Sequence, residues 1–198
     1  MLEDFIHSLT MLNGHLIALS AVLFFLGILL TDIVLEKNIG WLIAYPNWIY
    51  HKIEYVVQKF NGMLFIFVFI FVFNSINLFF GYVSGFLVIL PYVLVIWTGL
   101  NVGIVVRQTM QEESILYLFL NPIALFELPA VWISFSLGME VGIHLIFTKQ
   151  FNTMQQIFLD RLSVFYLIVL PLLAISALIE SGMIRFINNK AESENSQD

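Results

Sequence analysis

The chain has 198 residues, of which 60% are hydrophobic and 11% are charged, and its mean hydropathy is +0.94. A soluble domain of this size carries roughly 25% charged residues, so the composition excludes a soluble globular protein and indicates an integral membrane protein. Cysteine is absent, which excludes disulfides and Cys-ligated metals within the chain, and the net charge of −6 without a basic cluster argues against nucleic-acid binding.

Five apolar segments are long enough to cross a membrane, which takes about 20 residues. They cover residues 15–36, 61–80, 84–106, 115–147 and 162–184. The run from Phe60 to Val106 contains no acidic or basic residue, so it is expected to fold back on itself at the turn 81–85. The predicted fold class is therefore all-α, a polytopic bundle of about five spans that forms one transmembrane domain over residues 1–186.

The connection between the first two segments is amphipathic. Apolar residues recur at helical spacing over about residues 47–60, and tryptophans and tyrosines cluster around them. This pattern is typical of a helix that lies in the membrane interface. A weaker second interfacial helix is expected over 151–162, and the polar residues 187–198 are expected to form a disordered tail.

The distribution of lysine and arginine predicts the orientation, because both favour the cytoplasmic side of a membrane. No lysine or arginine precedes the first segment, whereas three lysines follow it and Arg107 follows the third segment. An external N-terminus in a multi-pass protein of the cell membrane is therefore expected. Charge does not decide whether 115–147 crosses once or is re-entrant. We favour a short half-helix up to Asn121, a break, and one full crossing.

The fourth segment contains an acid between two prolines, in "LNPIALFELPAVW" (120–132). Pro122 and Pro129 each remove a backbone donor, so the helix is expected to break at both. Glu127 is far from any loop, and its carboxyl group is expected either to donate to a freed carbonyl or to pair with a cation, for which Arg107 is the candidate. Alternatively, Glu127 lies at the start of the helix that resumes after Pro122, where the helix dipole favours a carboxylate.

The other ionisable residues inside the segments have simpler interpretations. Glu140 and His144 are one helical turn apart and are expected to hydrogen-bond to each other. No third ligand is near them in the sequence, so no metal site is predicted, and no cofactor is expected. Glu180 is close enough to the end of its segment to reach the interface, where it would meet Arg185.

Asparagines and glycines inside the segments predict how the helices pack. Asn74, Asn77 and Asn101 are expected mainly to bridge neighbouring helices, at about 0.6–2 kcal/mol each. Gly-x-x-x-Gly pairs allow close helix packing in lipid, and they occur at Gly81 and Gly85, Gly99 and Gly103, and Gly138 and Gly142. The last two pairs have similar flanking sequences. We favour close packing of helices as the role of these glycines. Two alternatives stay open: the similar flanks could mark a faint inverted repeat, as in transporters, and a glycine face could form a homodimer.

The segment "NPIALFELPAVWISFSLGMEVG" (121–142) resembles the signature region of the stage II sporulation protein M family. In that family a proline is followed at a fixed spacing by Glu-Leu-Pro-Ala and then by a glycine-rich helix. Pro122, Glu127 and Pro129 occupy the corresponding positions here, and the similarity covers about residues 61–185. The resemblance implies a polytopic membrane protein.

The resemblance to the family also extends to residues outside the signature region. Asn74 matches the asparagine of an earlier segment, and Glu180 matches a second acid. Family members often have His-Gly just after the proline, where this chain has Ile123 and Ala124, so any role of that histidine is absent. In spore-forming bacteria, members act with partner proteins that remodel peptidoglycan during engulfment, and many other members occur in bacteria and archaea that do not sporulate.

Two functions are consistent with these features. The favoured one is a non-catalytic membrane scaffold or assembly subunit that acts with partner proteins in envelope or membrane remodelling, in contact with lipid and with other membrane proteins. The alternative is a transporter or channel-like subunit that uses Glu127 at a broken helix near the middle of the membrane as an ion or proton site. An enzyme is not expected, because the sequence has no His-Glu-x-x-His, Gly-x-Ser-Gly or Gly-x-Gly-Asp motif.

Overall fold

The computed structural model describes residues 2–59, 62–109 and 121–195, and every regular element in these ranges is helical. The elements are α1 (Leu2–Thr10), α2 (Gly14–Glu36), α3 (Gly40–Lys59), α4 (Met63–Val83), a 3₁₀ turn (Ser84–Leu87), α5 (Leu90–Thr109), α7 (Pro122–Thr148), α8 (Phe151–Val164), a π-helical turn (Phe165–Val169) and α9 (Leu170–Asn195). Five helical stretches are long and apolar enough to cross a membrane, which confirms the predicted all-α bundle.

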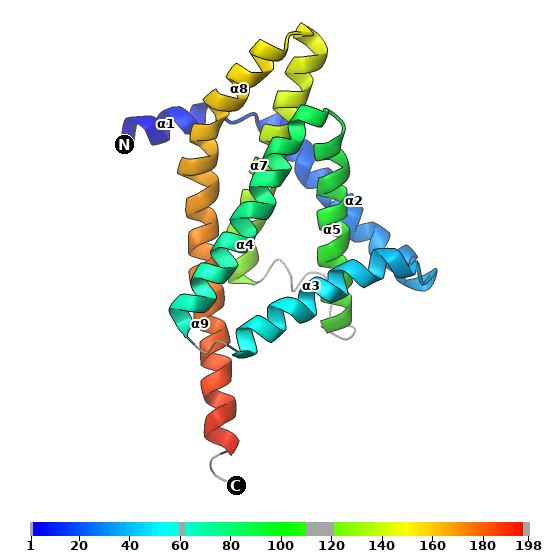
Figure 1. Cartoon of the computed structure of the whole chain (residues 1–198), viewed down its shortest axis with the longest axis vertical. Coiled ribbons are helices and arrows are strands. Elements are labelled where there is room, and N and C mark those ends of the chain that lie inside the picture. The colour runs from blue at the N-terminus through cyan, green and yellow to red at the C-terminus, as the bar shows by residue number, and fades with distance from the viewer. Residues whose placement is uncertain (1, 60–61, 110–120, 196–198) are drawn as a thin grey trace.

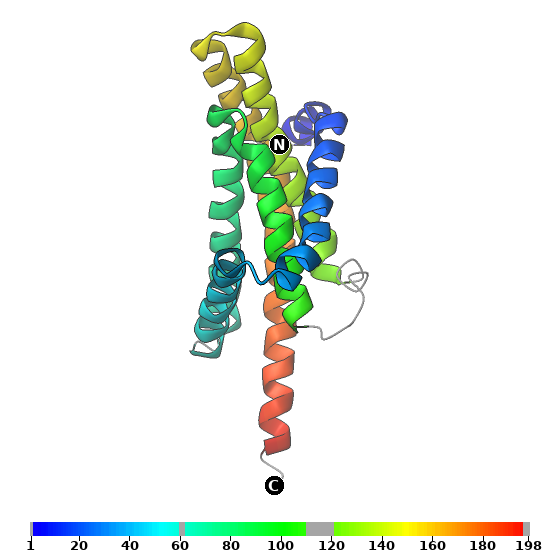
Figure 2. The same cartoon turned by 90° about the vertical axis from the view of Figure 1, so that its right-hand side faces the viewer.

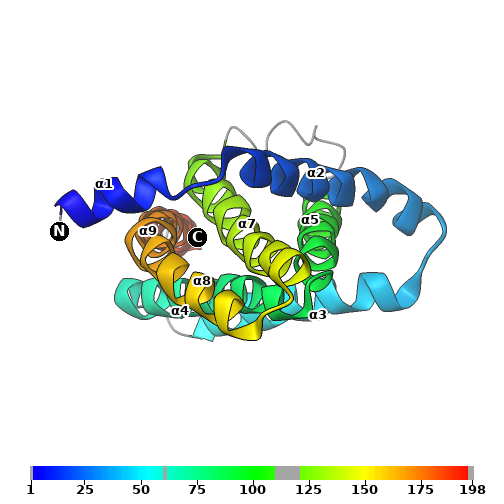
Figure 3. The same cartoon turned by 90° about the horizontal axis from the view of Figure 1, so that it is seen from above.

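The spans form a bundle with α7 near its centre (Figures 1 and 3). One end of the bundle carries α1, the α4–α5 connection and the α7–α8 connection, and is called the α1 end. The opposite end carries α3, the start of α7 and the C-terminus, and is called the α3 end (Figures 1 and 2). The predicted orientation would place the α1 end outside the cell and the α3 end in the cytoplasm.

α7 forms the core of the bundle. Its most apolar stretch is 67% buried, whereas those of the other four spans are 17% to 39% buried. Small residues on α7 allow the neighbouring helices to pack closely around it. Ser134 Oγ, for example, donates a 2.7 Å hydrogen bond to the carbonyl of Leu78 in α4. A polar side chain inside the bundle is therefore satisfied by the backbone of its neighbour.

The start of α7 is fixed by its local sequence. The side chain of Asn121 accepts a 3.0 Å hydrogen bond from the backbone N–H of Ile123, and Pro122 occupies the first turn, where a missing N–H costs little. A helix therefore begins at Pro122, and at 27 residues it is long enough for the single full crossing that we favour. The predicted half-helix before Asn121 falls almost entirely on residues 110–120, outside the described ranges.

The predicted break at Pro129 is wrong, because α7 continues through it. Proline in a helix conflicts with the carbonyl four residues earlier, here that of Leu125. The side chain of Leu125 is on the exposed face of the helix, whereas Leu128 and Ala130 are buried in the core. Packing on the buried face thus holds the helix across the proline.

Glycines bring α2 and α5 into direct backbone contact, which confirms their predicted packing role. A Cβ added at Gly99 would meet the carbonyl oxygen of Phe24, and one added at Gly27 would meet that of Ile96. A Cβ at Gly103 would meet the side chain of Thr31. Because this glycine face is filled by the chain itself, a homodimer through it would have to displace α2.

The glycine pair of α7, Gly138 and Gly142, packs at the α1 end. Gly138 lies against the backbone of Gly81 and Tyr82, and Gly85 lies against the carbonyl of Gly138. Gly142 similarly contacts the backbone of Val88. These contacts hold α7 against the α4–α5 connection, whereas the glycines of α5 pack against α2.

The fifth span differs from its prediction at both ends. α8 and α9 are joined by the π-helical turn, so 151–162 belongs to a continuous membrane-crossing helix rather than to a separate interfacial one. Pro171 follows the turn, and its missing N–H and its clash with the carbonyl of residue 167 explain the local widening. α9 runs to Asn195, so helix is found where a disordered tail was expected.

Helices that lie across the spans are found at both ends. α3 carries exposed Trp41, Trp48 and Tyr55 and has Lys52 over the ring of Trp48, as expected of an interfacial helix. At the other end α1 lies sideways to the bundle (Figure 1), with Phe5 exposed. The apolar spacing of residues 2, 5, 6 and 9 is the signal for α1, which the sequence analysis missed.

Candidate functional site: a polar crevice between α4 and α5

α4 and α5 separate from each other below their short connection, and a crevice of about 310 Å³ lies between them. In Figure 1 α4 and α5 diverge from their connection, α7 lies behind α4, and α3 runs between the lower parts of α4 and α5. Five of the lining residues are polar: Asn74, Asn77, Thr98, Asn101 and Glu127. The structure thus brings together three of the predicted intramembrane polar residues, Asn74, Asn101 and Glu127, with Asn77 beside them.

Glu127 is held at the back of the crevice by a contact between two spans. Asn74 Nδ2 in α4 donates to Glu127 Oε1 in α7 at 3.4 Å. Asn74 therefore bridges two helices, as expected, through a long hydrogen bond that leaves the other carboxylate oxygen available. Glu127 is only partly buried because the crevice reaches it.

The depth of Glu127 differs from the prediction. It lies five residues after Pro122 in a helix of 27 residues, which places it roughly 8 Å along the axis from the helix start. Glu127 is thus nearer to the α3 end than to the middle of the span. It also lies beyond the first turn, where the helix dipole acts most strongly, so the dipole contributes little to its stability.

The predicted pairing of Glu127 with Arg107 is wrong. Arg107 Nη2 instead forms a 3.0 Å ion pair with Asp32 Oδ2 of α2. The reason is the glycine contact described above, because it presses α5 against α2 and directs the last turn of α5 toward the end of α2. Arg107 is therefore not available to Glu127.

A second carboxylate lies near Glu127. Glu180 of α9 is close enough for its charge to act on Glu127. α9 and α7 meet at this level, since Ser176 Oγ, one turn before Glu180, donates to the carbonyl of Ile123 at 3.4 Å. The two acids that the family resemblance singled out are thus neighbours in space, although 53 residues separate Glu127 from Glu180 in the sequence.

Glu127 also borders a second, smaller cavity of about 130 Å³. This cavity extends to Asn121 at the start of α7. Thr98, Glu127 and Val131 line both spaces and therefore form the partition between them. A single carboxylate thus faces the lateral crevice on one side and the beginning of its own helix on the other.

Two of the asparagines leave hydrogen-bonding capacity in the crevice. Asn77 is exposed although it lies in the middle of a membrane span. The Oδ1 atom of Asn101 is buried and has no hydrogen-bond partner within the described residues. Unsatisfied polar groups are costly in lipid, so both amides favour an occupant with hydrogen-bond donors.

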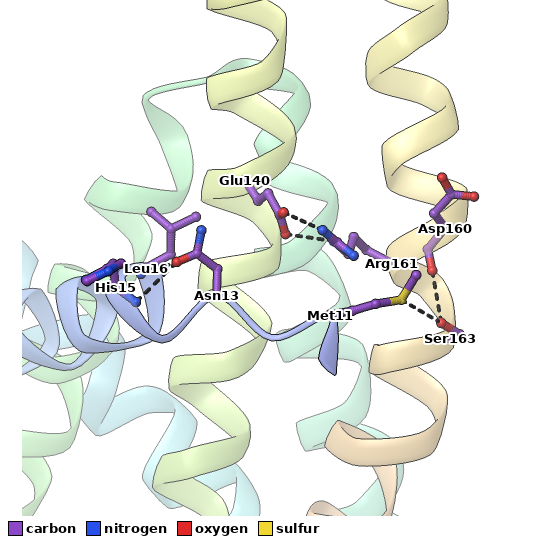
Figure 4. Close-up of polar contacts among 8 residues, drawn as sticks. All are labelled: Met11, Asn13, His15, Leu16, Glu140, Asp160, Arg161 and Ser163. Atoms are coloured by element: carbon purple, nitrogen blue, oxygen red, sulfur yellow. Dashed lines mark hydrogen bonds and ion pairs between the residues drawn. The ribbon is translucent and has the colours of Figure 1, made fainter. Parts of the chain in front are cut away.

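A separate ionic contact ties α7 to α8 near the α1 end. Arg161 Nε donates to Glu140 Oε2 at 2.8 Å and Arg161 Nη2 donates to Oε1 at 2.6 Å, a bidentate pair shown in Figure 4. Glu140 therefore pairs with Arg161 and not with His144, whose backbone carbonyl accepts from Thr148. The sequence analysis missed Arg161, although an arginine among apolar residues is itself a signal.

Aromatic packing supports this ionic contact. The Tyr82 hydroxyl donates to the carbonyl of Phe158, one turn before Arg161, and the two rings stack with centroids 4.6 Å apart. Since Gly138 also contacts Tyr82, the α1 end is joined by packing, a hydrogen bond and an ion pair. These contacts make the region a structural junction between α4, α7 and α8.

The chemistry of the crevice is that of a site for hydrogen-bond donors or cations. Carboxylate and amide oxygens line it, and none of the side chains that line it in the described ranges is basic. Within those ranges no group of three potential metal ligands comes together. A positively charged or donor-rich group would therefore be bound more favourably than an anion.

Comparison with known proteins supplies the family. Residues 17–183 match the family model described as SpoIIM, stage II sporulation protein M. The chain belongs to the SpoIIM family. The match begins within α2 and so includes every helix that lines the crevice, which extends the SpoIIM similarity beyond the residues 61–185 identified from the signature segment. A search of curated proteins and a search of solved structures each found no match.

Proposed function

We propose that this SpoIIM-family protein is a non-catalytic assembly subunit of the cell membrane that binds partner proteins during envelope or membrane remodelling. The observation that carries the proposal is Asn77, a polar side chain exposed in the middle of α4. Its neighbours Ile76 and Phe80 are 64% and 60% exposed. An apolar helix surface with one amide suits contact with another membrane helix better than contact with lipid alone.

The rest of the fold supports a binding role. The glycine contacts and the Glu140–Arg161 pair hold α2, α5, α7 and α8 together, so the lateral crevice is set in a stiff framework. Interfacial helices at both ends anchor that framework in the bilayer. A subunit of this kind presents a preformed surface to its partner, which lowers the cost of association.

Removing the Asn77 amide is expected to weaken partner binding. Asn77→Leu should lower the amount of partner recovered with the tagged chain from native membranes by about 3- to 30-fold, since interhelical hydrogen bonds contribute about 0.6–2 kcal/mol. Ile76→Leu, on the same exposed surface, is the matched control and should leave recovery unchanged. Equal recovery with both variants would overturn the role of Asn77.

A second candidate function, transport of protons or small cations, is favoured by the position of Glu127 between two cavities. A carboxylate at such a partition is suited to take up a cation from one side and release it to the other. The first proposal is preferred because Thr98 and Val131 form the partition between the two cavities, and passage would require them to separate.

Glutamine at position 127 tests this second candidate. Glu127→Gln keeps the shape of the side chain and its acceptor for Asn74, so assembly of the bundle should be retained. If the chain transports protons, flux in liposomes should fall to the background of empty vesicles. A wild-type chain that gives no flux, or a variant with unchanged flux, rules transport out.

A further inference from the structure

We infer that the crevice binds a basic side chain carried by a transmembrane helix of a partner protein, with Glu127 as its counter-ion. This inference rests on the assembly function proposed above and adds the chemistry of the partner. Charge is the first argument for it. Glu127 places a carboxylate at the back of the crevice, Glu180 lies close enough for its charge to act on Glu127, and no basic side chain among the described lining residues offsets these charges.

Two arginines of the membrane-spanning helices are already paired with other acids. Arg107 is paired with Asp32 at 3.0 Å, and Arg161 is paired with Glu140 at 2.6 Å. A charged carboxylate without a cation is costly inside a membrane. Because the described lining of the crevice holds no basic side chain, a positive charge supplied by a partner would stabilise the ionised form of Glu127 in the assembled state.

Hydrogen-bonding geometry points to an ammonium or guanidinium group. A lysine ammonium has three donors and no acceptor. The crevice offers three acceptors: the carboxylate oxygen of Glu127 that Asn74 does not engage, the Oδ1 of Asn101, which has no partner among the described residues, and the amide oxygen of exposed Asn77. A volume of about 310 Å³ lies within the range of small-ligand pockets, roughly 300–1,000 Å³.

The form of the opening favours a helix over a lipid as the source of the charge. The crevice opens sideways between α4 and α5, and Ile76 and Phe80 present an apolar surface beside it. A helix laid along this surface is complementary to it, and the long stem of a lysine reaches Glu127 from there. A lipid ammonium is fixed at the headgroup, so it would have to leave the interface to do the same.

A designed probe tests the inference. The full chain is placed in phosphatidylcholine nanodiscs with a labelled polyleucine helix that carries one lysine at the depth of Glu127, and binding is followed by fluorescence energy transfer. The lysine helix should bind at least about tenfold more tightly than an otherwise identical helix with leucine, since hydrogen bonds to charged groups contribute about 1.5–3 kcal/mol. Glu127→Gln should abolish that difference, whereas Glu36→Gln, at the exposed end of α2, should preserve it.

Each contrary result has a defined meaning. Equal binding of the lysine and leucine helices to the wild-type chain overturns the inference, as does an unchanged preference in Glu127→Gln. If nanodiscs that contain phosphatidylethanolamine remove the lysine preference, the lipid ammonium is the occupant and a partner side chain is excluded. The assembly function fails separately, because its own test is the Asn77-dependent recovery of partners from native membranes.

Discussion

Replacing Arg161 with methionine is expected to destabilise the chain by up to about 3–5 kcal/mol, the cost of removing one partner from a fully buried ion pair, because Glu140 is buried while Arg161 is only partly so. The change leaves the carboxylate of Glu140, a residue only 7% exposed, without its two charge-assisted hydrogen bonds. Thermal unfolding of the purified protein in nanodiscs, followed by circular dichroism, measures the effect. A melting temperature within about 2–4 °C of the wild type would correspond to only about 1 kcal/mol and would contradict the prediction.

The double variant Glu140→Met with Arg161→Met provides the control. It removes both charges and leaves apolar side chains of similar length between α7 and α8. Because a buried ion pair replaced as a whole is often neutral or stabilising, the double variant should recover most of the stability that Arg161→Met loses. If it is as unstable as the single variant, the loss arises from packing and not from an unpaired charge.

Replacing Gly99 with leucine is expected to prevent α5 from packing against α2. The first carbon of any side chain at this position would meet the carbonyl oxygen of Phe24, and a helix backbone has little freedom to move aside. Overpacking of this kind costs about 1–3 kcal/mol even where side chains can adjust, so a larger loss is expected here. Size-exclusion chromatography of the extracted protein should show a smaller monodisperse fraction.

Gly182 offers a matched control for the glycine prediction. It also lies in a membrane-crossing helix, but a Cβ added there would meet nothing within 4 Å. Gly182→Leu adds the same side chain and should give the elution profile of the wild type. If Gly99→Leu and Gly182→Leu behave alike, close approach of α2 and α5 is not required for folding.

The features that could be predicted from the sequence are those that depend on local pattern. Long apolar runs define the spans because a membrane helix must satisfy its backbone internally. Pro122 after Asn121 predicts a helix start for similarly local reasons, and the Gly99–Gly103 spacing predicts a close helix contact. In each case the physical cause lies within a few residues of the chain.

The partners of the charged residues could not be predicted, because they depend on how the helices come together. Arg161 reaches Glu140 only because α8 remains helical and folds back along α7. Arg107 turns to Asp32 rather than to Glu127 because glycines press α5 against α2. Spacing along a single helix, which suggested Glu140 with His144, carries no information about such contacts.

The crevice depends on the same long-range arrangement. The sequence places asparagines in two spans and an acid in a third, but the space they share exists because α4 and α5 separate below their connection. Asn77 received little weight from the sequence because a mid-span asparagine usually bridges helices within its own chain. Its exposure is what distinguishes it from Asn74.

The unbroken helix from α8 through α9 has a mechanical consequence. The 38 residues from Phe151 to Asn188 extend over about 57 Å at 1.5 Å per residue, whereas a bilayer with its headgroups is roughly 40–45 Å thick. At least one end must therefore project into water. In Figure 2 the lower end of α9 stands clear of the other helices. A load applied to that free end would be transmitted as tilt along one rod to the Arg161 junction on the opposite side of the membrane.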